Sequence, residues 1–514
     1  MIARILGRAA GAPRADAPPR KLASLLADRF DLALVAVAIA LYVVLKDVPL
    51  GHDQSWYLVS INKLFHGARL YVDVIEINPP LNFYLLMPPV YLAQLLGTSP
   101  EHVFVAYVIV LAGVSTLWAR RWMLTLSGVS RVHANIASVV ALLSTTAFTA
   151  YDYGQRDVLL VVFTLPYLAA SMRRLEGGRV PTGSAVAIGL WAALGICLKP
   201  FFLIFPLVTE IMLFLNRRRV PGRMRPELVA IGIAGAAYVA VVVTVFPDYL
   251  GSVVPLGQLT YFAYGTHFPY SLISTEILTF PLILGAYVAM RRRGALGPEL
   301  DMLAAWTVAA AISYVVQNRG FTYHAAPLRI MMVFLGASLL CRKAMAPAVL
   351  PRVLTVIGFV LIGFRLFVMG LYDEQWLDQA RAKLARYDTR DGLYTFTAHV
   401  FIGFPLANHF DGPWVSRFPC LWPVPGAERI LAAPQNYTPE QVAAAKRADR
   451  YVTDAVVEDF QRQMPSVVIV DARPDKDYFD GVKFDYVANL ERDPRFARLW
   501  RHYRRVDTLY GFDI

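Results

Sequence analysis

Long apolar segments alternate with short polar loops over residues 31–371, and a more polar tail follows. Several of the apolar windows reach the roughly 20 residues that a bilayer-spanning helix needs. The pattern predicts eleven spanning helices, with bounds at about 31–50, 101–119, 134–151, 157–172, 182–198, 201–215, 228–246, 271–290, 301–317, 325–341 and 352–371. The fold class indicated is therefore a polytopic α-helical membrane protein.

The apolar segment 82–97 does not fit this series, because it is short and contains Pro88-Pro89. Proline removes a backbone donor and often kinks or ends a helix. Two interpretations stay open. The segment is either a re-entrant or interfacial helix, or the first part of a long and bent second span.

Basic residues set the predicted orientation. Residues 1–30 are basic, and alternate loops carry short basic runs, namely Arg120-Arg121, Arg173-Arg174, Arg217-Arg218-Arg219, Arg291-Arg292-Arg293 and Arg342-Lys343. Since cytoplasmic loops are enriched in Lys and Arg, this alternation places the N-terminal segment and the basic loops in the cytoplasm. It also accounts for the net charge of +12 without a nucleic-acid partner. With eleven spans, the loop 51–81 and the tail lie on the opposite side.

The tail, residues 372–514, has a higher charge density and shorter apolar runs than the rest of the chain. The stretches 394–406 and 466–472 are typical of buried strands. The stretch 438–463 is typical of a helix or helix pair, with Thr438 and Gln441 as a capping box. A segment of this length can hold its own core, so we expect a small α/β domain.

Ionisable residues are costly in a bilayer, so their positions are informative. They gather in the predicted outer loops, which contain Asp53 and Glu76, then Asp152, Arg156 and Asp157, then Lys199, then Tyr261, Tyr264 and His267, and finally Arg319, Tyr323 and His324. The sequence predicts a cavity at the outer leaflet with a carboxylate side and a basic side. Asp152, Arg156 and Asp157 could also form a local set of salt bridges.

Three stretches of the first outer loop carry a resemblance, namely GHDQSWYL, HGARLYVDV and INPPL. Together with GQRDVLL, LKP and QNRGFTYHAAP, they resemble the outer loops of the GT-C superfamily of membrane glycosyltransferases. Within it, the chain is similar to the bacterial branch of protein O-mannosyltransferases and the lipid A aminoarabinose transferase. The resemblance covers about residues 31–371 and does not extend to the tail.

The resemblance implies an inverting transfer of a sugar from a polyprenyl-phosphate donor to a hydroxyl of a glycan, lipid or protein. The site would lie on the periplasmic face of a bacterial inner membrane, where the tail would be a periplasmic domain. Asp53 matches the loop aspartate that acts as base, and Glu76 lies where several members have a second acid. The candidates for binding the donor phosphate are Arg156, Lys199, Arg319 and His324, and those for sugar or acceptor contacts are Tyr57, Tyr264 and Tyr323.

Two questions stay open at this point. Asp53 and Glu76 could hold a divalent cation such as Mg²⁺ or Mn²⁺, since such ions prefer oxygen ligands, but two carboxylates do not decide it. The alternative function is a transporter or flippase of a lipid-linked saccharide, which requires polar groups at the bilayer midplane. The interiors of the predicted spans are almost free of charge, which favours an enzyme.

Overall fold

The computed structural model describes residues 29–217, 224–265, 270–370 and 374–514. The chain forms two compact units, each of which combines segments far apart in the sequence. Unit 1 consists of Met1–Asp47, Val105–Ala237 and His267–Gly370, and unit 2 of Val48–Phe104, Tyr238–Thr266 and Leu371–Ile514. The predicted N-terminal segment 1–30, except for its last two residues, and the candidate His267 lie outside the described residues.

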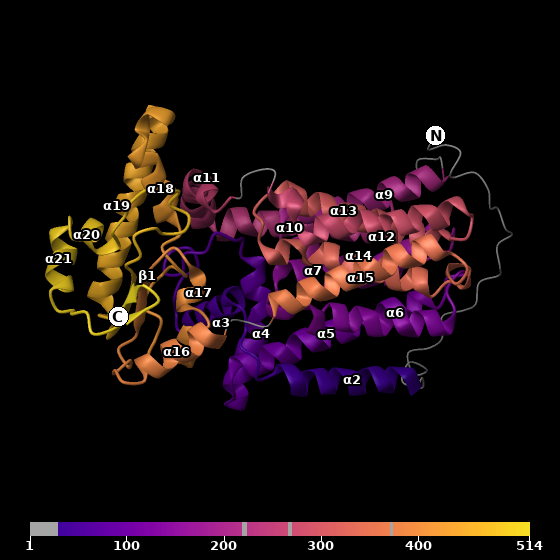
Figure 1. Ribbon diagram of the computed structural model, residues 1–514, viewed down its shortest axis with the longest axis horizontal. Coiled ribbons are helices and arrows are strands. Elements are labelled where there is room, and N and C mark those ends of the chain that lie inside the picture. The colour runs from indigo at the N-terminus through magenta and orange to yellow at the C-terminus, as the bar shows by residue number, and fades with distance from the viewer. Residues whose placement is uncertain (1–28, 218–223, 266–269, 371–373) are drawn as a thin grey trace. The chain divides into compact units, whose positions relative to one another are not determined.

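Unit 1 is a bundle of long helices joined by short loops (Figure 1). A helix lies at each predicted position: α2 (Arg29–Leu45), α5 (Pro100–Met123), α6 (Arg131–Ser144), α7 (Arg156–Leu175), α8 (Thr182–Ile196), α9 (Ile204–Arg217), α10 (Pro226–Val245), α12 (Thr275–Arg292), α13 (Pro298–Gln317), α14 (Ala326–Leu340) and α15 (Val349–Met369). The start of α5 and the end of α10 belong to unit 2. Short 3₁₀ helices link them: η2 (Ala147–Asp152), η3 (Pro200–Leu203), η6 (Tyr270–Ile273), η7 (Thr322–Ala325) and η8 (Lys343–Met345).

Six described helical segments are long and apolar enough to cross a membrane, namely Pro100–Met123, Arg156–Leu175, Pro226–Val245, Pro298–Gln317, Thr322–Leu340 and Val349–Met369. They differ in burial, since 89% of the most apolar window of α7 is buried, against 17% for α10 and α15. On α15, Phe364 and Phe367 are exposed, and large exposed apolar faces are typical of contact with lipid or a partner. These helices fit a multi-pass membrane protein, while the number of eleven spans stays a prediction.

Unit 2 is an α/β structure around a small sheet. Its helices are α3 (His52–Phe65), α4 (Leu81–Leu96), α11 (Val254–Thr260), α16 (Glu374–Leu384), α17 (Val400–Gly403), α18 (Pro423–Ala432), α19 (Pro439–Arg462), α20 (Tyr486–Leu490) and α21 (Pro494–Trp500). The shorter elements are η4 (Tyr249–Val253, a π-helix), η5 (Tyr261–Tyr264), η9 (Leu406–His409) and η10 (Pro434–Asn436). Unit 2 therefore contains the tail together with the first outer loop.

The sheet has the strand order β1-β2-β4-β3, with β1 at Leu393–Phe396, β2 at Val467–Asp471, β3 at Thr508–Leu509 and β4 at Phe512–Asp513. β1 and β2 are parallel, with Leu393 opposite Val467, and the other two pairs are antiparallel. The long helix α19 leads into β2, and its buried residues include Val456 and Phe460. Phe460 packs its ring against Tyr394 and Phe396 of β1, so helix and sheet share one core.

Two sequence predictions need correction. The strand predicted over 394–406 ends at Phe396, because the hydroxyl oxygen of Thr397 accepts from the backbone N–H of His399 and the chain turns into α17. The segment 82–97 is not broken at its prolines, since α4 runs through Pro88 and Pro89 as one helix. The fixed φ of proline fits a helix, although each of these prolines lacks a backbone donor and sets its ring against the carbonyl of residue i−4.

Candidate active site

Asp53 lies in the first turn of α3, at the start of the first outer loop. Its side chain is 21% exposed, and Nε2 of His52 lies 3.5 Å from its Oδ1. The N-terminal end of a helix favours negative charge, because its first backbone N–H groups have no partner within the helix. Asp53 is therefore an acid that solvent can reach, at a position that favours an anion.

Glu76, the second acidic candidate, is only 5% exposed. The indole N–H of Trp56 donates to its Oε2 at 2.7 Å. Its Oε1 accepts from the backbone N–H of Asn78 at 3.0 Å and also from the Asn78 side-chain amide. The carbonyl oxygen of Asn78 accepts from the Tyr71 hydroxyl at 2.8 Å. Glu76 therefore fixes the turn that ends the outer loop.

The buried thiol of Cys420 lies near both acids. Burial raises the pKa of this thiol, and the nearby carboxylates of Glu76 and Asp53 raise it further. Both acids therefore lie within electrostatic reach of one point in the core of unit 2. The structure brings Asp53 and Glu76 into one neighbourhood, as expected from their shared loop.

Two of the tyrosines predicted to contact a sugar or acceptor are packed into the core of unit 2. Tyr57 is 3% exposed, and its ring meets that of Phe83 edge-on with centroids 4.9 Å apart. Tyr264 is 8% exposed, and its hydroxyl donates to the carbonyl oxygen of Ala398 at 2.9 Å. Each ring supports the fold, and its contact with a sugar stays a prediction.

The tail holds the outer loop from one side. The ammonium of Lys63 donates to the carbonyl oxygen of Ser416 at 2.8 Å, and the N–H of Ile75 donates to that of Arg417 at 2.7 Å. Arg417 is itself fixed to α19, since its backbone N–H and its Nε donate to Asp459 at 3.0 and 2.9 Å. Burial lowers the pKa of Lys63 to about 8, with Asp459 opposing this effect. The loop is thus positioned by residues that follow it by more than 300 positions.

The basic candidates lie in unit 1, where Lys199 is the best defined. Its Nζ donates to Oδ2 of Asp157 at 2.6 Å and to Oε1 of Gln317 at 3.2 Å. The same atom lies 4.9 Å from the ring centroid of Tyr323. Lys199 immediately precedes η3, Asp157 lies at the start of α7 and Gln317 at the end of α13. The ammonium is therefore held between helix ends that are distant in the sequence.

The other three basic candidates gather at the same place. The imidazole of His324 lies within electrostatic reach of Lys199, Arg156 and Arg319, and its ring meets Tyr323 edge-on at 4.5 Å. Arg156 opens α7 and is 4% exposed, whereas Arg319 follows α13 and is partly exposed. The structure thus brings together all four residues predicted to bind the donor phosphate. We call Arg156, Lys199, Arg319 and His324 the cation cluster.

The buried polar atoms of this region that have no hydrogen-bond partner within the described residues include Nδ1 of His324 and Oδ1 of Asp157. Most buried polar side-chain atoms in proteins have a partner. Both atoms therefore retain hydrogen-bonding capacity beside the cation cluster.

Arg329 is a structural residue that the sequence analysis did not identify. It is 4% exposed, and its guanidinium donates to Oδ2 of Asp152 at 2.7 Å, to Oε1 of Glu276 at 2.8 Å and to the carbonyl oxygen of Thr322 at 3.2 Å. Thr322 also donates its hydroxyl to Asp152 at 2.9 Å. Arg329 thereby fixes η7, which carries two candidates, Tyr323 and His324. An arginine within an apolar segment was the available signal.

The carboxylates of Asp152 and Asp157 form ion pairs with residues distant in the sequence. Asp152 pairs with Arg329, and Asp157 pairs with Lys199. Arg156 and Asp157 are consecutive on α7, and consecutive residues on a helix do not face each other. Each carboxylate therefore has a cation partner from a distant segment, and a local set of salt bridges around Arg156 stays a prediction.

No group of three or more His, Cys, Asp or Glu side chains that could hold a metal ion occurs in the described ranges. Mg²⁺ commonly binds through one or two carboxylates, with water and substrate oxygens completing its shell. Asp53 and Glu76 could supply such a pair, although both oxygens of Glu76 already accept hydrogen bonds. A divalent cation at this loop stays a prediction.

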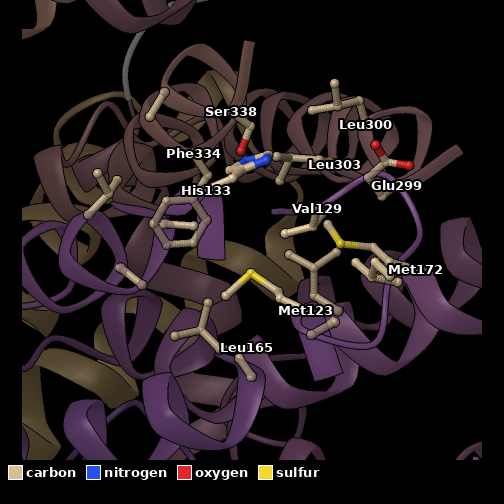
Figure 2. A pocket seen from close by; sticks show the side chains of 18 of the residues that line it. Met123, Val129, His133, Leu165, Met172, Glu299, Leu300, Leu303, Phe334 and Ser338 are labelled. Carbon is tan, nitrogen blue, oxygen red and sulfur yellow. The ribbon is translucent and has the colours of Figure 1, made fainter. Parts of the chain in front are cut away.

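Unit 1 also contains an apolar pocket of about 60 Å³ among α5, α6, α7, α13 and α14 (Figure 2). Its lining is apolar except for Thr116, His133, Glu299 and Ser338. Glu299 pairs with Arg342, which belongs to a loop predicted to be cytoplasmic. None of the candidate site residues lines this pocket, so it is separate from the cation cluster.

Neither a protein-family model nor a curated protein sequence matches this chain. Two solved structures align with long parts of it. The archaeal oligosaccharyltransferase AglB from Archaeoglobus fulgidus, in complex with an inhibitory peptide and a dolichol-phosphate, is 12% identical with a TM-score of 0.41, over 86% of this chain and 69% of that chain. An Archaeoglobus fulgidus oligosaccharyltransferase in the apo form is 14% identical with a TM-score of 0.38, over 72% of this chain and 59% of that chain. A likeness of this size does not extend to activity, substrates or site residues.

Proposed function

We propose that the chain is a membrane glycosyltransferase of the GT-C type, which transfers a sugar from a polyprenyl-phosphate donor to an acceptor hydroxyl. In this proposal the cation cluster binds the donor phosphate, and Asp53 is the base. The acceptor belongs to a glycan, lipid or protein at the periplasmic face of a bacterial inner membrane. The transfer inverts the configuration of the sugar.

The observation that carries the proposal is the convergence of the cation cluster at one place in unit 1, where Lys199 contacts Tyr323 and Tyr323 contacts His324. Arg156, Lys199 and Arg319 carry positive charge there, and Lys199 is paired with the carboxylate of Asp157. When the bond between sugar and phosphate breaks, negative charge grows on the phosphate oxygens. Fixed cations stabilise that charge most strongly where water is excluded.

The choice of Asp53 as base rests on the contrast with Glu76. A general base must take a proton from the acceptor hydroxyl as its oxygen attacks the anomeric carbon. Protonation of Glu76 would oppose the hydrogen bonds that it accepts from Trp56 and Asn78. Asp53 is partly exposed. Glu76 then acts by positioning the loop, or by contacting the acceptor or a metal ion.

The donor and the acceptor are identified first, by comparing cells that have the gene with cells that lack it. Mass spectrometry of polyprenyl-linked lipids and envelope glycans should show one accumulated lipid-linked sugar and one acceptor that lacks it. This donor and acceptor then serve in a transfer assay with the purified chain in lipid vesicles. Unchanged lipids and glycans in the cells that lack the gene would contradict the proposal.

Replacing Asp53 by Asn tests the base. We expect transfer to fall about 10²–10⁴-fold, the usual contribution of general base catalysis, with donor binding retained. The matched control is Asp73→Asn in the same loop, because Asp73 pairs with Arg69 and Arg462 and is assigned no chemical role. Full activity of the Asp53 variant would refute the assignment.

The same vesicles separate transfer from transport. A flippase would move the lipid-linked sugar across the bilayer without consuming it. Movement of the donor without transfer, unaffected by Asp53→Asn, would replace this proposal by the transporter alternative.

A further inference from the structure

A groove of about 750 Å³ borders β2 in unit 2. This volume lies in the usual range of small-ligand sites, about 300–1,000 Å³. Its lining comes from the tail alone, chiefly from the residues around β2 and from those after α21. None of the candidate active-site residues lines it. The groove is therefore a separate feature of the molecule.

One edge of β2 is open at the groove. β4 pairs only with Val470 and Asp471, so within the described chain no strand covers the first three residues of β2 on that side. Alternate residues of a strand direct their N–H and C=O groups to opposite edges. The N–H of Val467 donates to the carbonyl oxygen of Gly392, directly before β1, so Val468 directs its backbone groups to the open edge. The groove thus offers a backbone donor and acceptor beside Val468.

Two aromatic rings form part of the lining. Trp500 and Tyr503 are both partly exposed, and their rings are stacked with centroids 5.0 Å apart and planes 19° apart. The Tyr503 hydroxyl donates to the carbonyl oxygen of Pro465 at 2.6 Å, which holds the pair against the start of β2. A rigid aromatic surface beside polar backbone groups suits a ligand that has both C–H faces and hydroxyl groups.

The acidic and basic side chains that line the groove differ in their hydrogen bonding. Asp471 accepts three hydrogen bonds from Arg473, Asp485 caps α20, and Asp513 accepts from Thr508. By contrast, the exposed side chains of His502 and Arg504 have no hydrogen-bond or ion-pair partner in the described part of the chain. These three acids accept hydrogen bonds within the fold, whereas a fourth lining acid, Asp391, is exposed. His502 and Arg504 are lining side chains that can donate to an anionic group of a ligand.

We propose that this groove binds an anionic saccharide, with the sugar ring against Trp500 and Tyr503 and its carboxylate or phosphate on Arg504 and His502. The backbone groups beside Val468 bond the sugar hydroxyls. Arg504 is suited to this role because a guanidinium binds a carboxylate or phosphate through two parallel N–H donors. The inference is independent of sugar transfer and concerns a second site in the tail.

Isothermal titration calorimetry of the full chain in detergent tests this proposal. The probes are a trimer of galacturonic acid, mannose 6-phosphate, neutral maltotriose and triglutamate. We expect at least one of the two anionic sugars to bind about tenfold more tightly than maltotriose and triglutamate, the size of one charge-assisted hydrogen bond. The comparison of the galacturonic acid trimer with mannose 6-phosphate shows whether the groove prefers a carboxylate or a phosphate. Binding of neither anionic sugar, or equal binding of triglutamate, would overturn the proposal.

Two arginine variants of one short segment make a matched pair. Arg504 lines the groove and Arg501, at the end of α21, does not, although both are exposed. Arg504→Gln should weaken binding of the anionic sugar about tenfold, and Arg501→Gln should leave it unchanged. Equal melting temperatures of both variants and the parent chain would establish that the fold is retained. Equal affinities of the two variants would place the ligand elsewhere.

Discussion

Lys199 and Asp157 form a buried ion pair whose structural role is separable from binding a phosphate. The Nζ atom lies 2.6 Å from Oδ2, and Asp157 is fully buried. Removing one partner of such a pair leaves an uncompensated charge, whereas removing both restores neutrality. The pair can therefore be examined by comparing single and double variants.

We predict that Lys199→Met destabilises the protein by about 3–5 kcal/mol, and that Lys199→Met with Asp157→Asn is more stable than Lys199→Met alone. Thermal unfolding in detergent measures both. The double variant should still have lost donor binding, because the cation is gone. A double variant no more stable than the single one would show that Asp157 is not neutralised by Lys199 in the folded protein.

At the scale of elements, the start of α19 is a point where sequence and structure agree. The Thr438 side chain accepts from the N–H of Gln441 at 3.2 Å, and the Gln441 side chain accepts from the N–H of Thr438 at 2.9 Å. Both bonds of the predicted capping box are present, and a single helix follows. The alternative of a helix pair over 438–463 is therefore wrong.

We expect Thr438→Ala to lower the stability of this helix end by about 1 kcal/mol, because the backbone N–H of Gln441 loses the side-chain oxygen that it donates to. Hydrogen exchange followed by mass spectrometry should show faster exchange in the first turn of α19. Thr438→Ser keeps the hydroxyl and should exchange like the parent chain. Identical exchange in all three proteins would mean that the cap contributes nothing measurable.

The contact between α18 and α19 predicts a dependence of stability on pH. Burial, with Asp449 of α19 adding to it and Arg492 opposing, raises the pKa of Glu428 from 4.5 to about 7. The folded protein therefore binds this proton more tightly than the unfolded chain does. Its stabilising effect is complete below about pH 4.5 and is lost as the pH rises through about 7.

The variant Glu428→Gln should not show this loss of stability with rising pH, because its side chain does not titrate. Relative to the variant, the parent chain should lose stability between pH 5 and pH 8, on the order of 1 kcal/mol after allowance for solvent screening of a partly exposed group. Melting temperatures of both proteins across this range give the comparison. A constant difference between the two proteins would show that Glu428 keeps an ordinary pKa.

Local pattern predicted the elements better than it predicted their contacts. Apolar runs located the helices of unit 1, and the stretch SVVIVDA located β2, because burial of backbone and side chains follows from local composition. The strand at 394–406 was predicted too long, because one hydroxyl, that of Thr397, redirected the chain. The periodicity of apolar residues does not predict single side-chain hydrogen bonds of this kind.

At the scale of the whole molecule, the unpredicted features are pairings across long sequence separations. Arg329 and Asp152 are 177 residues apart, and Lys63 and Ser416 are 353 apart. Such partners depend on the rotation of each helix and on which segments become neighbours, and neither follows from one sequence without an alignment. Residue type did select Arg156, Lys199, Arg319 and His324, because ionisable groups beside apolar segments are rare and costly.

The predicted topology can be tested on the whole chain through the parity of its spans. An odd number of spans puts the tail on the side opposite to the basic loops. Ala443 of α19 and Ser127, which follows α5, are both exposed and suit cysteine substitution. The variants are made in a chain in which Cys197 and Cys341 are replaced by Ala, and the remaining Cys420 is buried and should stay unlabelled. A membrane-impermeant maleimide should label Ala443→Cys in intact spheroplasts. It should label Ser127→Cys only after the membrane is permeabilised. Labelling of both positions only after permeabilisation would require an even number of spans, and Asp53 would then have to be reassigned, because the loop and the tail share unit 2.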